Sequence, residues 1–243
     1  MKLQNQDQHR LWSFYQNRHA HSFGGAHARL DFIVNDAMRR GCRGASARVL
    51  NIGAGDGYLE SRGRQLEWHM YTLDPDDETI RRLRAAGVRA FQGVIEKMPF
   101  EADFFDAVVA SEVLEHLKPA QLDAGLQEVS RVLKPAGWFL GTVPFQEDLA
   151  LNMVLCPHCG QVFHRWGHAA AFDAGKLEAR LAPFFGVVQL QVRAFVSLRR
   201  RKLPQKLKGL VRLALGRFGA AIAAPNIYFA ARKVPPGKRA AVG

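Results

Sequence analysis

The sequence predicts an α/β domain with a doubly wound, mostly parallel sheet and helices on both faces. Short apolar runs alternate with amphipathic stretches through the middle of the chain, a pattern typical of parallel strands connected by helices. A glycine-rich turn follows the first run, as expected where a ligand binds at the carboxyl ends of the strands. The predicted strands are 47–52, 69–73, 88–91, 107–110 and 138–143, followed after a change of pattern by 186–198 and 226–231.

Helices are expected before, between and after these strands. Before the first strand, residues 9–41 carry apolar side chains at helical spacing and end in two arginines and Gly41, as helices often do. A further amphipathic stretch precedes the run 138–143, and 173–182 has helical spacing again. The apolar positions that define the first two stretches are Leu30, Ile33, Val34, Ala37, Leu122, Leu126, Val129 and Leu133.

The composition is that of a globular protein with a substantial core. The chain has 243 residues, of which 48% are hydrophobic. Its polar start, MKLQNQDQHR, does not resemble a secretory signal, and no apolar run is long enough to span a bilayer. Three cysteines are too few for a disulfide scaffold in a chain of this length. We therefore expect a cytoplasmic protein.

The segment VLNIGAGDGYLE, residues 49–60, indicates a ligand site. An apolar strand runs into Gly53, Gly55 and Gly57 and then into a predicted helix. Glycine permits a tight turn and lets backbone N–H groups approach a ligand without an intervening Cβ. The dinucleotide fingerprint G-x-G-x-x-G would place a glycine at position 58, where this chain has Tyr58. The spacing therefore favours a ligand that lays a carboxylate and a ribose, and not two phosphates, against the loop.

An acidic residue ends the next predicted strand. Asp74 lies 21 positions after Gly53, and a carboxylate there can accept hydrogen bonds from both ribose hydroxyls. Taken singly, the glycines are compatible with a surface turn and Asp74 with a helix N-cap. Together, in this order and at this spacing, they predict a nucleoside site.

Four strings of the chain carry a family resemblance: VLNIGAGDG, TLDPDD, FQGVIEKMPFEADFFDAVVASEVLEHL and EVSRVLKPAGWFLGTVPF. In this order they resemble the class I S-adenosylmethionine-dependent methyltransferases, and most closely their small-molecule branch, called type 11. The resemblance covers about residues 47–145 and implies a Rossmann-like sheet of seven strands with the last strand antiparallel. It also implies contacts with S-adenosylmethionine at Asn51, Gly53, Ala54, Gly55, Asp74, Pro75, Val94, Ile95 and Ser111.

Two positions depart from the family pattern. The family often has Asp after the glycine of its third motif, near the adenine amino group, where this chain has Val94. The usual Cys and Thr of the first loop are replaced by Ala54 and Asp56. Because the glycines and Asp74 are retained, we expect altered cofactor binding and not its loss.

The resemblance also implies the chemistry. The methyl group of S-adenosylmethionine is activated by its positive sulfonium, so the protein mainly has to align a nucleophile and exclude water. We expect the acceptor to be a small or lipid-linked molecule methylated at oxygen, which requires removal of a proton. Glu112, His116 and the histidines between 158 and 168 are candidates for that task. Glu115 and His116 suit a helix N-terminal contact or a buried, hydrogen-bonded role better than catalysis, so we assign no general base.

Residues 156–168 read CPHCGQVFHRWGH and form an insertion rich in metal-binding side chains. Cys156, Cys159, His164 and His168 have the spacing C-x2-C-x4-H-x3-H, and two thiolates with two imidazoles can complete a tetrahedral Zn2+ shell. We predict that these four residues bind zinc in a structural knuckle over the acceptor site. The alternatives are a redox pair, free thiols, and histidines that bind substrate. In relatives with the family resemblance, the region around His168 borders the substrate pocket.

The basic character of the chain is confined to its C-terminal part. The net charge is +12, and from position 197 onward there are 12 Lys or Arg and no acidic residue. Residues 203–218 place leucines on one helical face and cations on the other, and Arg199–Arg201 precede them. The segment 199–218 is therefore typical of a helix attracted to an anionic membrane surface. The alternative is a helix packed on its own domain, and aromatic side chains for nucleic-acid stacking are sparse there.

These observations divide the chain into four parts. We expect an N-terminal helical cap over 1–45 and an S-adenosylmethionine-binding core over 46–145. The Cys/His insertion spans 146–172, and a C-terminal part over 173–243 completes the sheet and carries the basic helix. Two other functions stay open: a catalytically silent module that binds RNA, protein or membrane, and a nicotinamide-dependent oxidoreductase, which Tyr58 counts against.

Overall fold

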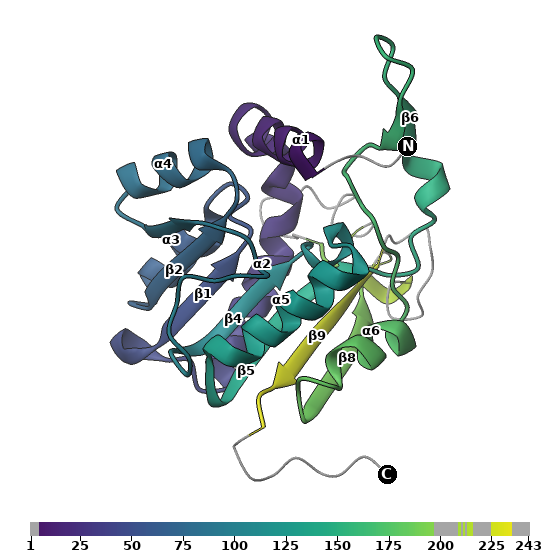
Figure 1. Ribbon diagram of the computed structural model, residues 1–243. Helices are drawn as coiled ribbons and strands as arrows, with labels where there is room; N and C mark the ends of the chain where they lie inside the picture. The colour runs from purple at the N-terminus through teal and green to yellow at the C-terminus, as the bar shows by residue number, and fades with distance from the viewer. Residues whose placement is uncertain (1–4, 197–208, 210, 212, 216–224, 235–243) are drawn as a thin grey trace.

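The computed structural model describes residues 5–196, 209, 211, 213–215 and 225–234 (Figure 1). Seven strands form one sheet in the order β3-β2-β1-β4-β5-β9-β8. Strands β1 to β5 are mutually parallel, and β9 runs antiparallel to both of its neighbours, β5 and β8. The strands are β1 (Arg48–Ile52), β2 (His69–Asp74), β3 (Arg89–Gln92), β4 (Phe105–Ser111), β5 (Leu133–Pro144), β8 (Val187–Arg193) and β9 (Asn226–Arg232).

This architecture confirms the predicted fold class. Each predicted apolar run forms a strand of the sheet, and the resemblance correctly implied seven strands with the last one, β9, antiparallel. The largest difference is β5, which begins at Leu133 and so extends the predicted run 138–143 toward the preceding helix.

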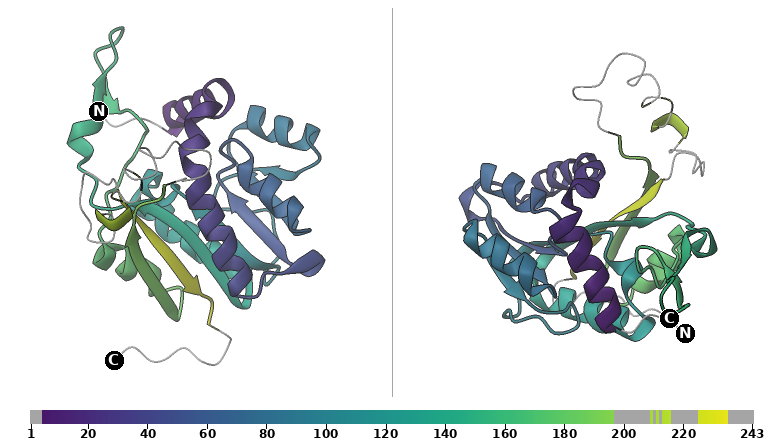
Figure 2. Two further views of the ribbon diagram at one scale, coloured as in Figure 1. Left: turned by 180° about the vertical axis from the view of Figure 1, so that it is seen from behind. Right: turned by 90° about the horizontal axis from the view of Figure 1, so that it is seen from above.

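Helices cover both faces of the sheet (Figures 1 and 2). Helix α2 (His27–Arg39) and helix α3 (Tyr58–Gln65) share one apolar cluster with Val49, Ala107 and Val109. Helix α5 (Pro119–Val132) and helix α6 (Ala174–Leu181) share the other with Leu50, Val108 and Ala110. Because successive residues of a strand point to opposite faces, β4 contributes alternately to the two clusters. Helix α4 (Asp77–Ala85) packs on β3 at the sheet edge.

The N-terminal extension is helical, as predicted, but it is not one helix. Helix α1 (Asn5–Arg18) is followed by the 3-10 helix η1 (Ala20–Ala26), and only then by α2. Helix α1 lies at the end of the sheet where β1 and β4 terminate, seen at the top of Figure 1, while α2 crosses the face of the sheet (Figure 2). Two further 3-10 helices, η3 (Leu114–His116) and η4 (Leu149–Asn152), follow β4 and β5 at this end, whereas η2 (Gly44–Ser46) precedes β1 at the opposite end.

The insertion after β5 forms a small hairpin. Strand β6 (Met153–Leu155) pairs with β7 (Val162–His164), and the turn between them projects from the body of the molecule (Figure 1). Several apolar side chains of this region are exposed, including Leu151, Leu155 and Val162.

The predicted basic amphipathic helix over 199–218 lies largely outside the described residues. Within it, residues 209, 211 and 213–215 are helical. Among the helices that the structure describes, none combines the length and apolar character needed to cross a bilayer.

Candidate active site

A large cavity lies at the carboxyl ends of the parallel strands. Its volume is about 1030 Å³, and all nine residues predicted to contact S-adenosylmethionine line it. Parallel α/β sheets bind ligands at this edge, where the loops after the strands meet. The other side of the cavity is lined by α1, η1 and the segment after β5, which contribute Trp12, Phe23, Glu147 and His168 among others.

The glycine-rich loop bends sharply after β1. Gly53, Gly55 and Gly57 have φ angles of 82°, 54° and 86°, in the left-handed region that favours glycine. A Cβ on Gly53 would lie 3.0 Å from Val113 Cγ2, so a side chain there would meet both strain and a close neighbour. The loop therefore exposes backbone to the cavity, as a nucleoside site requires.

Asp74, at the end of β2, points back toward this loop. Its Oδ2 accepts hydrogen bonds from the Ala54 N–H at 2.8 Å and from Gln16 Nε2 at 2.9 Å, and its Oδ1 accepts one from the Asp76 N–H at 2.9 Å. The residue is 2% exposed. Burial raises the pKa of Asp74, while the hydrogen bonds from Ala54, Asp76 and Gln16 lower it. The carboxylate is thus oriented within the cavity wall before any ligand binds.

Asn51 lies beneath the same loop. Its Nδ2 donates to Glu60 Oε1 at 2.7 Å, and Thr72 Oγ1 donates to the same oxygen at 2.7 Å. All three side chains are buried. This bridge joins β1, β2 and α3 directly under the glycines and fixes the loop from below.

The remaining predicted contacts lie on the far side of the loop. Val94 and Ile95 follow β3, with Val94 partly exposed and Ile95 buried. Ser111, at the end of β4, accepts a hydrogen bond from Arg29 Nε at 2.9 Å, and its Oγ lies 3.0 Å from Thr142 Oγ1. Arg29 comes from α2 and brings a cation into the cavity, a contribution that the sequence pattern did not indicate.

The structure does not bring the four residues predicted to bind zinc together, and neither group of potential metal ligands among the described residues contains a cysteine. The two cysteines lie at the turn of the β6–β7 hairpin, where the Cys156 N–H donates to the Gln161 carbonyl, while His164 pairs with Met153 at the other end. Three residues of extended strand separate Cys156 from Met153, a distance of about 10 Å. The spacing in the sequence was compatible with a knuckle, but the antiparallel ladder holds the cysteines and histidines apart.

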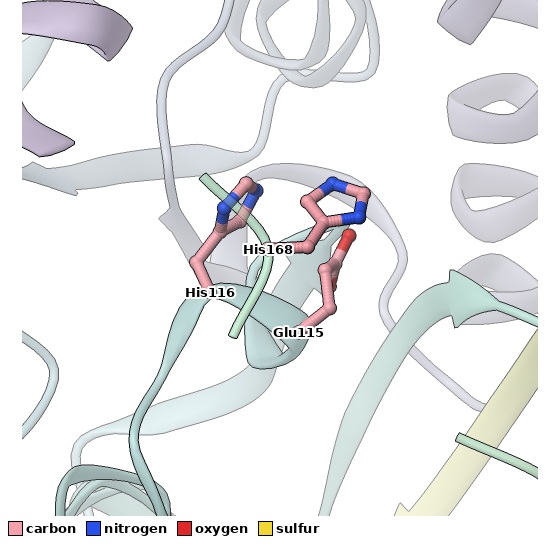
Figure 3. Close-up of side chains that lie close together, drawn as sticks. All are labelled: Glu115, His116 and His168. Atoms are coloured by element: carbon pink, nitrogen blue, oxygen red, sulfur yellow. The ribbon is translucent and has the colours of Figure 1, made fainter. Parts of the chain in front are cut away.

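The histidines instead join glutamates from other parts of the chain. Glu115, His116 and His168 bring potential ligand atoms within 4.8 Å of one another (Figure 3). Glu147, His164 and His168 form a second such group. His168 Nδ1 and Glu147 Oε2 form a short contact, and His164 Nε2 lies 3.4 Å from Glu147 Oε1. His168, His116 and Glu147 line the cavity.

His116 is held in one orientation by its neighbours. Its Nδ1 lies 3.3 Å from the Gly167 carbonyl, and the Trp12 ring packs edge-on against the imidazole at 4.8 Å. Burial, together with the nearby His168, lowers the pKa of His116 to about 3. The imidazole is therefore neutral at physiological pH.

Comparisons with known proteins agree with this geometry. Residues 50–141 match the family model of the type 11 methyltransferase domain. An uncharacterized methyltransferase of Mycobacterium tuberculosis is 35% identical over 112 residues, which are 45% of this chain and 44% of that protein. A fatty-acid O-methyltransferase of Mycolicibacterium smegmatis is 39% identical over 101 residues, 39% of this chain and 36% of that protein. The human mitochondrial ubiquinone biosynthesis O-methyltransferase is 30% identical over 135 residues, 50% of this chain and 36% of that protein.

The chain thus spans less than half the length of these curated relatives. Solved structures resemble it over most of its length at low identity. A methyltransferase from Archaeoglobus fulgidus aligns with a TM-score of 0.59 and 16% identity, over 86% of this chain and 93% of that one. A chain from the complex of the Haloferax volcanii Trm112 methyltransferase activator with a methyltransferase aligns with a TM-score of 0.66 and 14% identity, over 93% and 98%.

Residues 50–141 are thus similar to the type 11 methyltransferase domain, and the chain has the fold of the solved S-adenosylmethionine-dependent methyltransferases.

Proposed function

We propose that this protein transfers a methyl group from S-adenosylmethionine to an oxygen atom of a small or lipid-linked acceptor. The main support is that one cavity gathers every residue that the family motifs assign to the cofactor and then continues past them to a wall of histidines and glutamates. Its volume of about 1030 Å³ is at the upper end of the usual range for ligand pockets, so it has room for a cofactor and an acceptor together.

The residues present fit the cofactor. The loop at Gly53 and Gly55 presents backbone without side chains, and Asp74 offers a carboxylate beside it to ribose hydroxyls. Arg29 supplies a cation close to Ser111, suited to a carboxylate. When bound, S-adenosylmethionine would supply a methyl group activated by a sulfonium.

The acceptor end of the cavity has the chemistry of an apolar molecule with one polar group. Trp12, Phe145, Leu151 and Phe195 line it together with Glu147 and His168. The apolar side chains exclude water from the transfer, and the polar groups can orient a hydroxyl or a carboxyl. The names of the fatty-acid and ubiquinone relatives support an oxygen acceptor on an apolar molecule.

The excess of basic residues in the C-terminal part of the chain supports a lipid-linked methyl acceptor. All of the excess positive charge lies beyond position 196, in the part of the sequence that contains the amphipathic segment 199–218. Such a segment is suited to an anionic membrane surface. We propose that the protein is cytoplasmic and contacts membranes peripherally through this segment.

Binding of S-adenosylhomocysteine, measured by calorimetry, tests the proposal. Asp74→Asn should weaken binding about 10- to 100-fold, because hydrogen bonds to a charged group contribute about 1.5–3 kcal/mol. Asp77→Asn is the matched control, since Asp77 is an exposed residue of the same acidic segment that does not line the cavity. Thermal unfolding of both variants would verify that they fold.

Two results would contradict the proposal: undiminished binding by Asp74→Asn, or binding of NAD in place of S-adenosylhomocysteine. If S-adenosylhomocysteine binds as expected, radiolabelled S-adenosylmethionine can be offered with phenols, fatty acids and lipid extracts. Label that enters an ether or an ester supports transfer to oxygen, and label recovered on nitrogen contradicts it.

A further inference from the structure

We propose that Glu115, His116 and His168 bind one divalent transition-metal ion in the wall of the cavity, at a site separate from the cysteine pair. The three side chains come from η3 and from the segment after β7, and they lie together in Figure 3. The ion itself is inferred from how these side chains are buried and hydrogen bonded.

Glu115 carries the strongest argument. The residue is 0% exposed, and neither carboxylate oxygen has a hydrogen-bond partner within the described part of the chain. Of the nearby charges, Glu112 and Glu147 have the same sign, and the Arg29 cation is close enough to favour the carboxylate but forms no hydrogen bond with it. A buried, unpaired carboxylate is costly, and native proteins nearly always pair such groups or place them on a cation. A metal ion would satisfy Glu115.

The imidazoles are oriented as metal ligands commonly are. His116 Nδ1 faces the Gly167 carbonyl, which can only accept, so this nitrogen carries the hydrogen and Nε2 retains a free lone pair. Glu147 holds His168 through Nδ1. Metal-bound histidines usually make such a contact to a carbonyl or carboxylate oxygen through the nitrogen that does not bind the metal.

The backbone locks the two halves of the proposed site together. The N–H groups of Ala169 and Ala170 both donate to the Glu115 carbonyl, at 2.7 and 3.0 Å. The His168 N–H donates to His164 Nδ1 at 3.1 Å, and the two rings stack at 4.6 Å. The ligands therefore sit on a fixed frame and need little rearrangement to bind an ion.

A second grouping, Glu147 with His164 and His168, is the less favoured site. Glu147 already contacts His168 and accepts from Asn152 Nδ2 at 3.0 Å, so its oxygens are engaged. We therefore assign Glu147 and His164 to positioning His168, and Glu115 to the ion.

Two imidazoles and one carboxylate suit Mn2+, Fe2+, Co2+ or Zn2+. Because His116 and His168 line the cavity, the ion would be accessible to an acceptor hydroxyl and would lower its pKa. This catalytic role rests on the proposed methyl transfer, whereas ion binding does not.

The test uses the full chain, purified without a metal-affinity tag and stripped with a chelator. Mn2+ alone is titrated by calorimetry, since Mn2+ avoids thiolates. Zn2+ alone is titrated into Cys156→Ser/Cys159→Ser, which lacks the cysteine pair and keeps only the buried Cys42. We expect one ion per chain in each case. His168→Ala and the isosteric Glu115→Gln should each weaken binding at least 100-fold, while Cys156→Ser/Cys159→Ser should change Mn2+ binding less than twofold.

The proposal is overturned if neither ion binds. It is also overturned if the double cysteine variant loses Mn2+ binding, or if His168→Ala and Glu115→Gln retain Mn2+ binding. Binding of S-adenosylhomocysteine to the same preparations confirms that each variant is folded. It also separates the two proposals, because a protein that binds S-adenosylhomocysteine but no metal refutes only this inference.

Discussion

Glu60 is a carboxylate buried under the glycine loop, at 2% exposure. Its Oε1 receives hydrogen bonds from Asn51 and Thr72, and its Oε2 has no partner among the residues that the structure describes. Burial is the largest influence on the pKa of Glu60 and raises it, against the opposing effect of the two hydrogen bonds. The folded protein therefore keeps the Glu60 proton to a higher pH than an exposed glutamate would.

This burial makes folding stability depend on pH. An unfolded Glu60 ionises near its ordinary pKa of 4.5, whereas the folded one keeps its proton to higher pH. Its contribution to the free energy of unfolding is thus complete below pH 4.5 and is lost as the pH rises through the folded pKa. Glu60→Gln cannot ionise, so urea unfolding between pH 4.5 and pH 8 should show a smaller decline with rising pH than in the parent.

The exposed Glu101 offers a matched control for this experiment, as Glu101→Gln. Parallel pH profiles for the parent and Glu60→Gln would contradict the prediction.

Individual site residues were predictable where a short, continuous sequence motif contains them. The glycines and Asp74 belong to short motifs, and all nine residues inferred from those motifs line one cavity. Gln16 and Arg29 were not predicted, because their partners Asp74 and Ser111 lie 58 and 82 positions away along the chain. Such contacts depend on how the helices pack, which spacing within a motif does not encode.

At the scale of elements, the tightest packing in the sheet is at Gly141 of β5. This residue pairs with Ala110 on β4 and with Phe229 on β9. A Cβ at this position would lie 1.9 Å from the Ala110 carbonyl oxygen and 2.5 Å from Phe229 Cζ. No side chain fits there without a shift of the sheet.

Gly141→Ala should therefore lower the free energy of unfolding by about 3 kcal/mol or more, at the upper end of the cost of overpacking a core. Urea denaturation at neutral pH measures this. Gly175→Ala in α6 is the control, since its added Cβ would make only an ordinary 3.6 Å contact with Asp173 and should change stability by less than about 1 kcal/mol. Equal stabilities of the two variants would show that β5 adjusts to a side chain.

The conformation of the β6–β7 hairpin could not be predicted from the spacing of its cysteines and histidines. The C-x2-C-x4-H-x3-H spacing limits how far apart the four side chains can be, but it does not say whether the chain between them is coiled or extended. Two short strands extend it, and the histidines are left beside Glu147 and Glu115, from other segments. Local sequence thus identified metal-binding residue types without identifying their partners.

At the scale of the whole molecule, the fold was predictable because the same sequence pattern recurs along the chain. Apolar strands and amphipathic helices alternate several times, and each repeat supports the same parallel arrangement. The placement of α1 over the cavity carried no such signal, since a helix can cap a sheet in many positions.

Because the excess positive charge is concentrated in the C-terminal part, we expect the protein to bind anionic membranes. It should cosediment with anionic vesicles at low salt and not with zwitterionic ones. Replacing residues 199–202 with glutamine removes four cations and should weaken vesicle binding roughly 100-fold or more, at about 1 kcal/mol per charge. Unchanged binding after deletion of 199–218 would refute the membrane contact.

Helix α1 is hydrogen bonded to both ends of the cavity. Gln16 and Asn17 donate to Asp74 and Asp76 at the nucleoside end, and Gln8 donates to the Gly167 carbonyl beside His116 at the other. If a ligand draws Gln16 away from Asp74 and α1 moves as one body, the contact of Gln8 with Gly167 would change as well. Ligands at the two ends would then be coupled, and each would change the affinity of the other by the same factor.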